Sequence, residues 1–490
     1  MHATDEVQVG FGHQQVQAEG GRLTMQVQIE LDLPMPASDE RLPQQIEQSV
    51  DQAGQQFKRE MFRLAMEKAD AELVLAGRDG ESGHGTRRRG TGPMTFKTRF
   101  GTVEVQRQRV EDKATGKVTT PAAKAWNTPQ QVTITRGLRQ QVCQTVRNQS
   151  MQDSLEQVEE QAGEPGLLGK TTVEEIVHAE GKALEEALRQ RAQAVMDAHP
   201  QAAAFFVPAA ERAGQAIDDE ESLFEDFPEP EPPTGFGETD EAEEFERLEG
   251  PRAVDEGCVI VQADEVKVKA QACTGRKEVW VYTAVIMTAT ATWRFAAQST
   301  DLLWLQVGAW LTTLGVHEGK LRLLALADGA KWIRVWYESL DLPGTAMILC
   351  WYHLKKRCGQ LLSMACRGRE HRRQLERELR GLLWEGRVGE AIAMLQSRRE
   401  QMKTPDRLDE LIKYLCARQP YIPNYRERQS AGLWVASNRV EKLNDWAVSQ
   451  RCKHSGMAWA PAGVLALAWL EVTDRNGELP VWWERQELSP

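Results

Sequence analysis

A short apolar run that ends on an aspartate constrains the fold of this chain more than any other stretch. Residues 321–327 are mostly apolar and have no helical period, which indicates a buried strand. Asp328 and Gly329 follow, and residues 331–336 then show the spacing of one helix face. A carboxylate at the C-terminal end of a strand, beside the next helix, lies where open α/β sheets place their chemistry. An ordinary Asp-Gly strand-to-helix turn has the same pattern, so Asp328 needs companions before it indicates a site.

The residues around this strand predict the rest of a mixed five-stranded sheet. Four more apolar or alternating segments have strand character, at 259–269, 278–287, 292–297 and 346–350. Helices are expected at 300–314 and from residue 331 onwards. Three consecutive strands followed by a helix, a strand, a helix and a strand form the element order of an RNase H-like domain. The fold class expected from the sequence is therefore α/β.

A helical segment interrupts this domain. Residues 354–429 lose all strand character and form amphipathic, Arg-rich helical patterns, expected at 354–381, 382–399 and 406–418. Helical character resumes at about residue 438 and includes a Trp- and Ala-rich helix at 462–471. We therefore expect a catalytic domain in two parts, 257–353 and 430–490, around an all-helical insertion at 354–429.

The N-terminal half opens with a strand and a helix and then becomes basic. Residues 22–33 alternate apolar and polar, which predicts a half-buried strand, and residues 43–76 have a helical pattern, so a strand-and-helix region is expected at 1–80. The Gly-rich stretch 80–92 ends that helix, and a hairpin is expected from Met94 to Arg109. Residues 87–109 hold seven Lys and Arg against one Glu. A ribbon of this charge can clamp phosphates without reading bases, although an ordinary surface hairpin would look much the same. Its candidate DNA contacts are Arg87, Arg88, Arg89, Lys97, Arg99, Arg107 and Arg109.

The helices that follow resemble a helix-turn-helix in their spacing. Helical patterns at 138–148 and 151–161 precede a Gly- and Pro-containing break at 163–166. A long helix then opens at Lys170, with Thr171 or Thr172 as its expected N-cap. Two short helices, a Gly-containing turn and a helix opened by Thr suggest DNA contact by these three residues, although ordinary helical domains share this spacing. Together with the hairpin, they predict a mainly helical DNA-binding region at 81–213.

The net charge of −12 is unevenly distributed. Residues 218–256 hold 17 Asp and Glu and two Arg, a net charge of −15, so the rest of the chain carries +3. Residues 351–456 hold 22 Lys and Arg against 12 Asp and Glu. Low hydrophobicity, prolines and dense negative charge predict a disordered linker at 214–256. The basic C-terminal third points to a polyanionic partner, although basic residues also solvate helix faces.

Composition also bears on location. No apolar run reaches transmembrane length, and the first residues lack the pattern of a signal peptide. The eight cysteines form no Cys-x-x-Cys pair and are typical of reduced thiols in a cytosolic protein. The sequence therefore predicts a cytoplasmic protein with no membrane partner.

Three acids are placed where such a fold would bring them together. Asp264 lies in the first strand, Asp328 ends the fourth, and Glu441 lies on the helix after the insertion. Three carboxylates at one sheet edge can hold two Mg²⁺ ions, for which Mn²⁺ can substitute. Two such ions can activate a water or a 3′-hydroxyl and stabilise the leaving oxygen of an in-line displacement. Each acid by itself could be an ordinary strand-edge or helix-surface residue.

Five local patterns give a more specific indication. They are Val261-Gln-Ala-Asp264, Ala327-Asp-Gly-Ala-Lys-Trp-Ile333, Cys350-Trp-Tyr-His353, Ser437-Asn-Arg-Val-Glu441 and Arg451-Cys-Lys-His-Ser-Gly-Met-Ala-Trp459. Over about 80–200 and 255–485 the chain resembles the DDE transposases of bacterial insertion sequences (ISKra-like, related to the Mutator-like group with a Cys-x-x-His motif and a helical insertion before the last acid). The last two patterns are the most specific. The chain departs from many relatives in lacking a Cys-x-x-Cys element near 80–92.

The resemblance implies a role for each matched residue. Asp264, Asp328 and Glu441 would be the catalytic acids that hold the metals. Cys350, His353 and Asn438 would lie beside the site, while Arg451 and Lys453 would contact phosphates near the cleaved strand. Cys350 and His353 alone fall short of the usual four zinc ligands, and His353 could orient DNA or a catalytic acid or simply cap a helix.

The resemblance further implies a nucleoid-associated DNA transposase. Such an enzyme binds the terminal inverted repeats of its element, cleaves the DNA at the ends and transfers the 3′-hydroxyl ends into target DNA, as a homodimer or larger synaptic complex on double-stranded DNA. Two other classes stay open. One is a catalytically inactive, domesticated DNA-binding repressor, and the other is a structure-selective RNase H-fold nuclease, which would cut without joining ends.

Overall fold

The computed structural model describes residues 8–19, 22–32, 42–79, 85–128, 132–205, 254, 256–340, 342, 344–454 and 457–488. The chain forms two compact units, Met1–Ala179 and Glu180–Pro490. Helix α5 (Lys170–Ala198) begins in the first unit and continues into the second. Almost all of the predicted linker at 214–256 lies outside the described residues.

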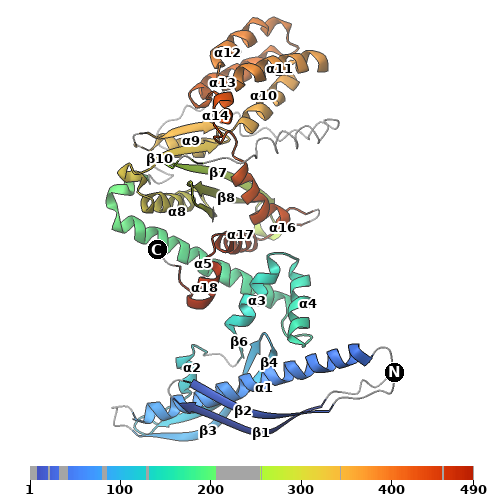
Figure 1. Ribbon diagram of the computed structural model, residues 1–490, viewed down its shortest axis with the longest axis vertical. Helices are drawn as coiled ribbons and strands as arrows, with labels where there is room; N and C mark the ends of the chain where they lie inside the picture. The colour runs from blue at the N-terminus through green and yellow to red at the C-terminus, as the bar shows by residue number, and fades with distance from the viewer. Residues whose placement is uncertain are drawn as a thin grey trace. The chain divides into compact units, whose positions relative to one another are not determined.

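The first unit contains a long helix and two antiparallel ribbons (Figure 1). Its opening elements are β1 (Gln8–Glu19), β2 (Arg22–Asp32), α1 (Leu42–Asp79), β3 (Thr86–Thr98) and β4 (Gly101–Asp112). The predicted strand, helix and hairpin are confirmed, whereas β1 was not predicted. Strand β3 begins inside the Gly-rich stretch that was expected to be only a break, and its ladder with β4 shifts register between Arg88 and Thr91. The hairpin packs on α1. Its buried cluster consists of Met94, Phe96, Val103 and Val105, and Phe62 and Met66 of α1 pack against this cluster.

Short elements complete the first unit. They are β5 (Val118–Thr119), α2 (Pro121–Ala125), β6 (Val132–Ile134), α3 (Arg136–Val146) and α4 (Met151–Ala162). Side chains of Thr135 and Ser150 cap α3 and α4, as helix N-termini require. The prediction that Thr171 or Thr172 caps the long helix is wrong, because α5 already begins at Lys170 and both threonines lie in its first turn.

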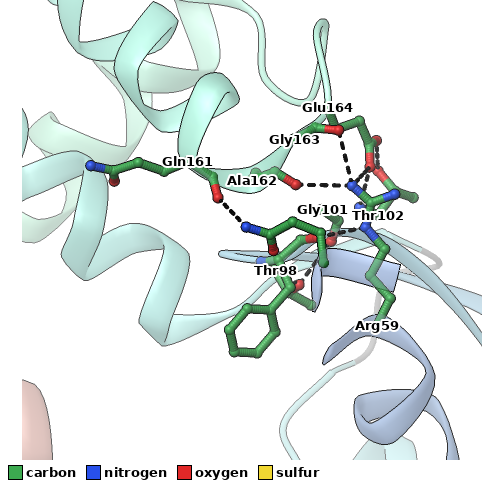
Figure 2. A network of polar contacts seen from close by, with 10 residues as sticks. Arg59, Thr98, Gly101, Thr102, Gln161, Ala162, Gly163 and Glu164 are labelled. Atoms are coloured by element: carbon green, nitrogen blue, oxygen red, sulfur yellow. Dashed lines mark hydrogen bonds and ion pairs between the residues drawn. The ribbon is translucent and has the colours of Figure 1, made fainter. Parts of the chain in front are cut away.

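Arg59 joins three parts of the first unit (Figure 2). From α1 it donates hydrogen bonds to the carbonyl of Phe100 in the hairpin turn, at 2.5 Å, and to that of Ala162 at the end of α4, at 2.9 Å. It also pairs with Glu164 at 3.4 Å, and Glu164 in turn accepts from the backbone N–H of Thr102 at 2.8 Å. This cation therefore satisfies carbonyls that the hairpin turn and the helix end leave without backbone partners.

The second unit is built on a mixed five-stranded sheet. Its strands are β7 (Cys258–Lys269), β8 (Glu278–Met287), β9 (Thr292–Ala297), β10 (Arg322–Ala327) and β11 (Ala346–Leu349). Their order is β11-β10-β7-β8-β9, with β8 antiparallel to both its neighbours and β10 parallel to both of its own. The predicted mixed α/β class is confirmed, and the strands and helices follow one another along the chain as predicted, whereas the order of strands within the sheet was not predicted.

Helices cover both faces of this sheet. On one face, Val259, Val261 and Ala263 of β7 pack in a large core with α8 (Thr300–Thr313) and α9 (Lys331–Glu338). Because side chains alternate along a strand, Gln262 and Asp264 of β7 face the other side. The helices there are α15 (Asn438–Asn444) and α17 (Pro461–Arg475).

The segment predicted to be all-helical is helical, with a different division into helices. Its helices are α10 (Trp351–Ala365), α11 (Arg369–Trp384), α12 (Val388–Ser397), α13 (Pro405–Arg418) and α14 (Tyr425–Ser430), which lie together beyond one edge of the sheet (Figure 1). The single helix expected at 354–381 is wrong, because the chain turns at Cys366 and a new helix begins after Gly368. The chain then runs through α15, a π-helical turn (Asp445–Ser449), α16 (Gln450–Cys452) and α17 to α18 (Leu479–Arg485).

Within the described ranges, no helix combines the length and the apolar character needed to cross a lipid bilayer. All eight cysteines lie in these ranges, and each is a free thiol.

Candidate active site

Two aspartates follow the last pair of the parallel β7–β10 ladder at equal separations. That pair is Ala325 with Val261, and Asp328 and Asp264 each lie three residues beyond it. Asp328 follows β10 directly, and its Oδ1 accepts a hydrogen bond from the N–H of Ala330 at 2.8 Å. Gly329 between them has φ +88°, a conformation that glycine adopts without strain. The Asp-Gly turn thus holds the carboxylate at the end of its strand.

Glu441 comes to the same face of the sheet because its helix is attached to β7. The buried side chain of Gln262 accepts hydrogen bonds from the N–H groups of Arg439 and Val440, at 3.1 and 3.2 Å. Both N–H groups belong to the first turn of α15, where the N–H of Val440 also donates to the carbonyl of the N-cap residue Ser437 at 3.2 Å. Since Gln262 and Asp264 point to the same face of β7, this contact brings the start of α15 beside Asp264.

A second attachment, not predicted from the sequence, holds the other end of α15. Asn444 donates from Nδ2 to Asp264 Oδ2 at 2.8 Å, and its Oδ1 accepts from Thr283 Oγ1 at 2.6 Å. Thr283 is the register partner of Asp264 in the β7–β8 ladder. The only signal in the sequence is the three-residue spacing of Asn438, Glu441 and Asn444, which places them on one helix face.

His353 lies among the three acids. It comes from the first turn of α10, and its Nδ1 is 3.8 Å from Glu441 Oε1. Burial lowers the pKa of His353, but its interactions with the neighbouring Cys350 and with the Asp328 and Glu441 carboxylates outweigh burial and raise the pKa above its usual value. The predicted position of His353 beside the acids is therefore observed.

The surroundings of Asp264 oppose its ionisation. Burial, and then the nearby Asp328 carboxylate, raise the pKa of Asp264 to about 7, although His353 acts in the opposite direction. Two carboxylates that repel each other in this way gain from a shared cation. Their hard oxygen atoms are the donors that Mg²⁺ prefers, so this pair, with Glu441 nearby, has the chemistry of a Mg²⁺ site.

The other predicted site residues are distributed between surface and interior. Asn438 is buried at the start of α15. Lys453 is exposed after α16, but Arg451 is buried and stacks on Trp459, with its guanidinium carbon 5.1 Å from the ring centre. Arg451 is therefore poorly placed for the predicted phosphate contact.

In the first unit, most of the predicted DNA contacts are exposed. These are Arg87, Arg88, Arg89, Arg99, Arg109, Lys170 and Thr171. Thr172 is half-buried, and Lys97 donates to the carbonyl of Leu167 at 2.6 Å. Arg107 differs, because it is buried and donates to Thr128 Oγ1 at 2.8 Å. Arg107 lies two residues after the buried Val105 and shares the inner face of the hairpin with it, so its expected role as a surface cation is not supported.

Part of the chain matches a known protein family. Residues 287–487 are similar to an uncharacterised protein family (UPF0236). The matched segment contains Asp328, Cys350, His353 and Glu441 and begins after Asp264. No curated protein matches the chain.

Proposed function

We propose that this chain is a DDE-type DNA transposase. It would bind the terminal inverted repeats of its own element, cleave the DNA at each end and join the freed 3′-hydroxyl ends to target DNA. The observation that carries the proposal is the convergence of Asp264, Asp328 and Glu441 around His353, on one face of a mixed sheet.

The strand order supports an RNase H-like assignment of this domain. In β11-β10-β7-β8-β9, the three consecutive antiparallel strands are extended by two parallel strands, each reached through a helix. In this proposal the aspartates come from the first and fourth strands of the domain, and the glutamate comes from the helix after the insertion. That is the arrangement expected of the family that the sequence resembles.

Asp264, Asp328 and Glu441 would hold divalent metal ions, Mg²⁺ or Mn²⁺. When bound, these ions would activate a water or a 3′-hydroxyl and stabilise the leaving oxygen. Asn444 and Thr283 would keep the Asp264 carboxylate in one orientation, and Gln262 would fix the start of the helix that carries Glu441. His353 would hold a positive charge beside the acids while the site contains no metal.

The exposed cations of the β3–β4 hairpin support a role of the first unit in DNA binding, separate from the chemistry of the second unit. Arg87, Arg88 and Arg109 are all exposed on this ribbon. Phosphate contacts of this kind position a protein on DNA and make its affinity depend on salt. We place end binding in the first unit and phosphodiester chemistry in the second, with a homodimer or larger assembly joining two ends.

The test uses DNA that flanks the gene on both sides, supplied as labelled duplexes with Mg²⁺ or Mn²⁺. Wild type should give nicked and joined products that require the metal, and Asp328→Asn should still bind these duplexes but give neither product. Asp197→Asn, at an exposed helix position, is the matched control and should behave as wild type. Cleavage that survives Asp328→Asn would contradict the proposed site, whereas metal-dependent cleavage without joining would favour a nuclease. Binding without cleavage by wild type would favour a repressor.

A further inference from the structure

Three different ligand types meet at the junction of the sheet and the insertion. Cys350 Sγ, a ring nitrogen of His353 and a carboxylate oxygen of Glu441 all lie within 4.8 Å of one another. Cys350 is the N-cap of α10 and His353 is the third residue of that helix, so one turn delivers both side chains. Glu441 comes from α15, a separate element.

The histidine at this junction has a buried nitrogen without a hydrogen-bond partner among the described residues. His353 Nδ1 is closed to solvent, and its distance of 3.8 Å from Glu441 Oε1 exceeds that of a hydrogen bond. A polar atom buried in this way costs free energy unless another group binds it. The nitrogen and the carboxylate therefore suit a ligand that both can contact.

Ser437 donates hydrogen bonds to the other two ligand atoms. The N–H of Ser437 donates to Cys350 Sγ at 3.3 Å, and Ser437 Oγ donates to Glu441 Oε1 at 3.4 Å. Cys350 is fully buried, so its sulfur has a fixed position and a fixed N–H donor. Outer hydrogen bonds of this kind orient the ligands of protein metal sites.

The ligand types decide which metal fits. Mg²⁺ takes oxygen ligands, whereas thiolate and imidazole favour Zn²⁺. Zinc sites that keep an open position use three protein ligands and a water. We propose that Cys350, His353 and Glu441 form a Zn²⁺ site with one open position, distinct from the Asp264–Asp328 pair.

This site has a consequence that rests on the proposed function. Glu441 is a ligand of both the proposed Mg²⁺ site and the proposed Zn²⁺ site. When Glu441 binds Zn²⁺ together with Cys350 and His353, it is no longer available to bind Mg²⁺ with the two aspartates. Zn²⁺ at low concentration then inhibits DNA cleavage in excess Mg²⁺.

Binding is tested without DNA, so its outcome does not depend on transposase activity. Metal-free full-length protein is titrated with Zn²⁺ against a chromophoric chelator, and with Co²⁺ to observe the thiolate-to-cobalt charge-transfer band. We expect one equivalent to bind with that band present. Cys350→Ala and His353→Gln should each weaken binding at least about 100-fold, because ligand loss should exceed the 10–100-fold cost of losing an outer-shell partner.

Cys358→Ala is the matched control, since Cys358 is another buried free thiol on α10, and it should bind as wild type. His353→Gln tests the site even where Cys350→Ala fails to fold, because the His353 side chain is 26% exposed. Absence of binding by wild type, or unchanged binding in folded Cys350→Ala and His353→Gln, overturns the proposal. A cobalt complex without the charge-transfer band also overturns it.

Discussion

At the scale of single residues, Asp264 is a carboxylic acid whose surroundings oppose its ionisation. Burial and Asp328 raise its pKa from 3.8 to about 7, so between these values the folded protein keeps a proton that the unfolded chain has lost. The free energy of unfolding therefore falls as the pH rises from about 4 to about 7 and stays low above that. Such a cost is expected where side chains are arranged for chemistry rather than for stability.

Asp264→Asn should accordingly stabilise the metal-free protein at pH 8 while it abolishes cleavage. We expect the gain in free energy of unfolding to be at least about 1 kcal/mol at pH 8 and to shrink towards pH 4, since one pKa unit corresponds to about 1.4 kcal/mol. Urea denaturation at both pH values in EDTA measures it. The exposed Asp197→Asn should leave stability nearly unchanged. An Asp264→Asn protein no more stable than wild type at pH 8 would show that the carboxylate is not strained.

At the scale of elements, the Arg59 side chain links α1 to the β3–β4 turn and to the end of α4 by hydrogen bonds (Figure 2). Gly101 in that turn has φ +109°, and an added Cβ would collide with the Arg59 guanidinium. The planar group donates in several directions at once, which an ammonium on a flexible stem does not reproduce.

Arg59→Ala should destabilise the first unit by about 2 kcal/mol, because it leaves two partly buried carbonyls without their charged donor. Arg59→Lys should restore less than half of that loss. The control is Arg63→Ala, one turn later on α1, which breaks only the pairs with Glu60 and Glu67 and should cost about 0.5 kcal/mol. Hydrogen exchange of the β3–β4 turn and of the end of α4 measures the effect. Equal protection in Arg59→Ala and Arg63→Ala would mean that Arg59 does not join these elements.

At the scale of the whole molecule, the proposed DNA-binding residues and the proposed catalytic residues lie in different units. The hairpin of the first unit carries the exposed arginines, whereas the second unit holds the acids and their histidine. Binding and chemistry should therefore be separable by mutation.

The double change Arg87→Ala and Arg88→Ala should weaken DNA binding by a similar factor on every sequence. The slope of log affinity against log salt should fall by about 2, because each lost phosphate contact removes about 0.9. Fluorescence anisotropy at several salt concentrations measures this slope. Lys124→Ala, an exposed cation on the short helix α2, serves as the control, and Co²⁺ binding should stay as in wild type. An unchanged slope would place the DNA interface elsewhere.

Local chemistry was enough to predict most elements of the chain. Apolar runs and alternation identified all five strands of the main sheet, and Asp328 was singled out because a strand ends on it. The wrong or missing elements were those whose neighbouring residues show no clear break or no regular alternation. The break at Cys366–Gly368 lies inside a continuous Arg-rich pattern, and β1 has an irregular alternation with a register shift between Phe11 and Gln14.

Which of these elements meet depends on contacts between distant parts of the chain. A strand pattern fixes which side chains share a face, but the register between β7 and β10 depends on hydrogen bonds between segments about sixty residues apart. Gln262 contacts the start of α15, and Asn444 at the end of α15 contacts Asp264 of β7. The spacing of Asn444 from Glu441 indicates only a shared helix face and not these partners, because a polar side chain looks the same in the sequence whether it meets water or a helix end. For the same reason Arg107 and Arg451 resembled surface cations, and burial alone distinguishes them. Local patterns were therefore enough to find the acids and the elements that carry them, whereas the partners of these side chains follow from packing between elements distant in the chain.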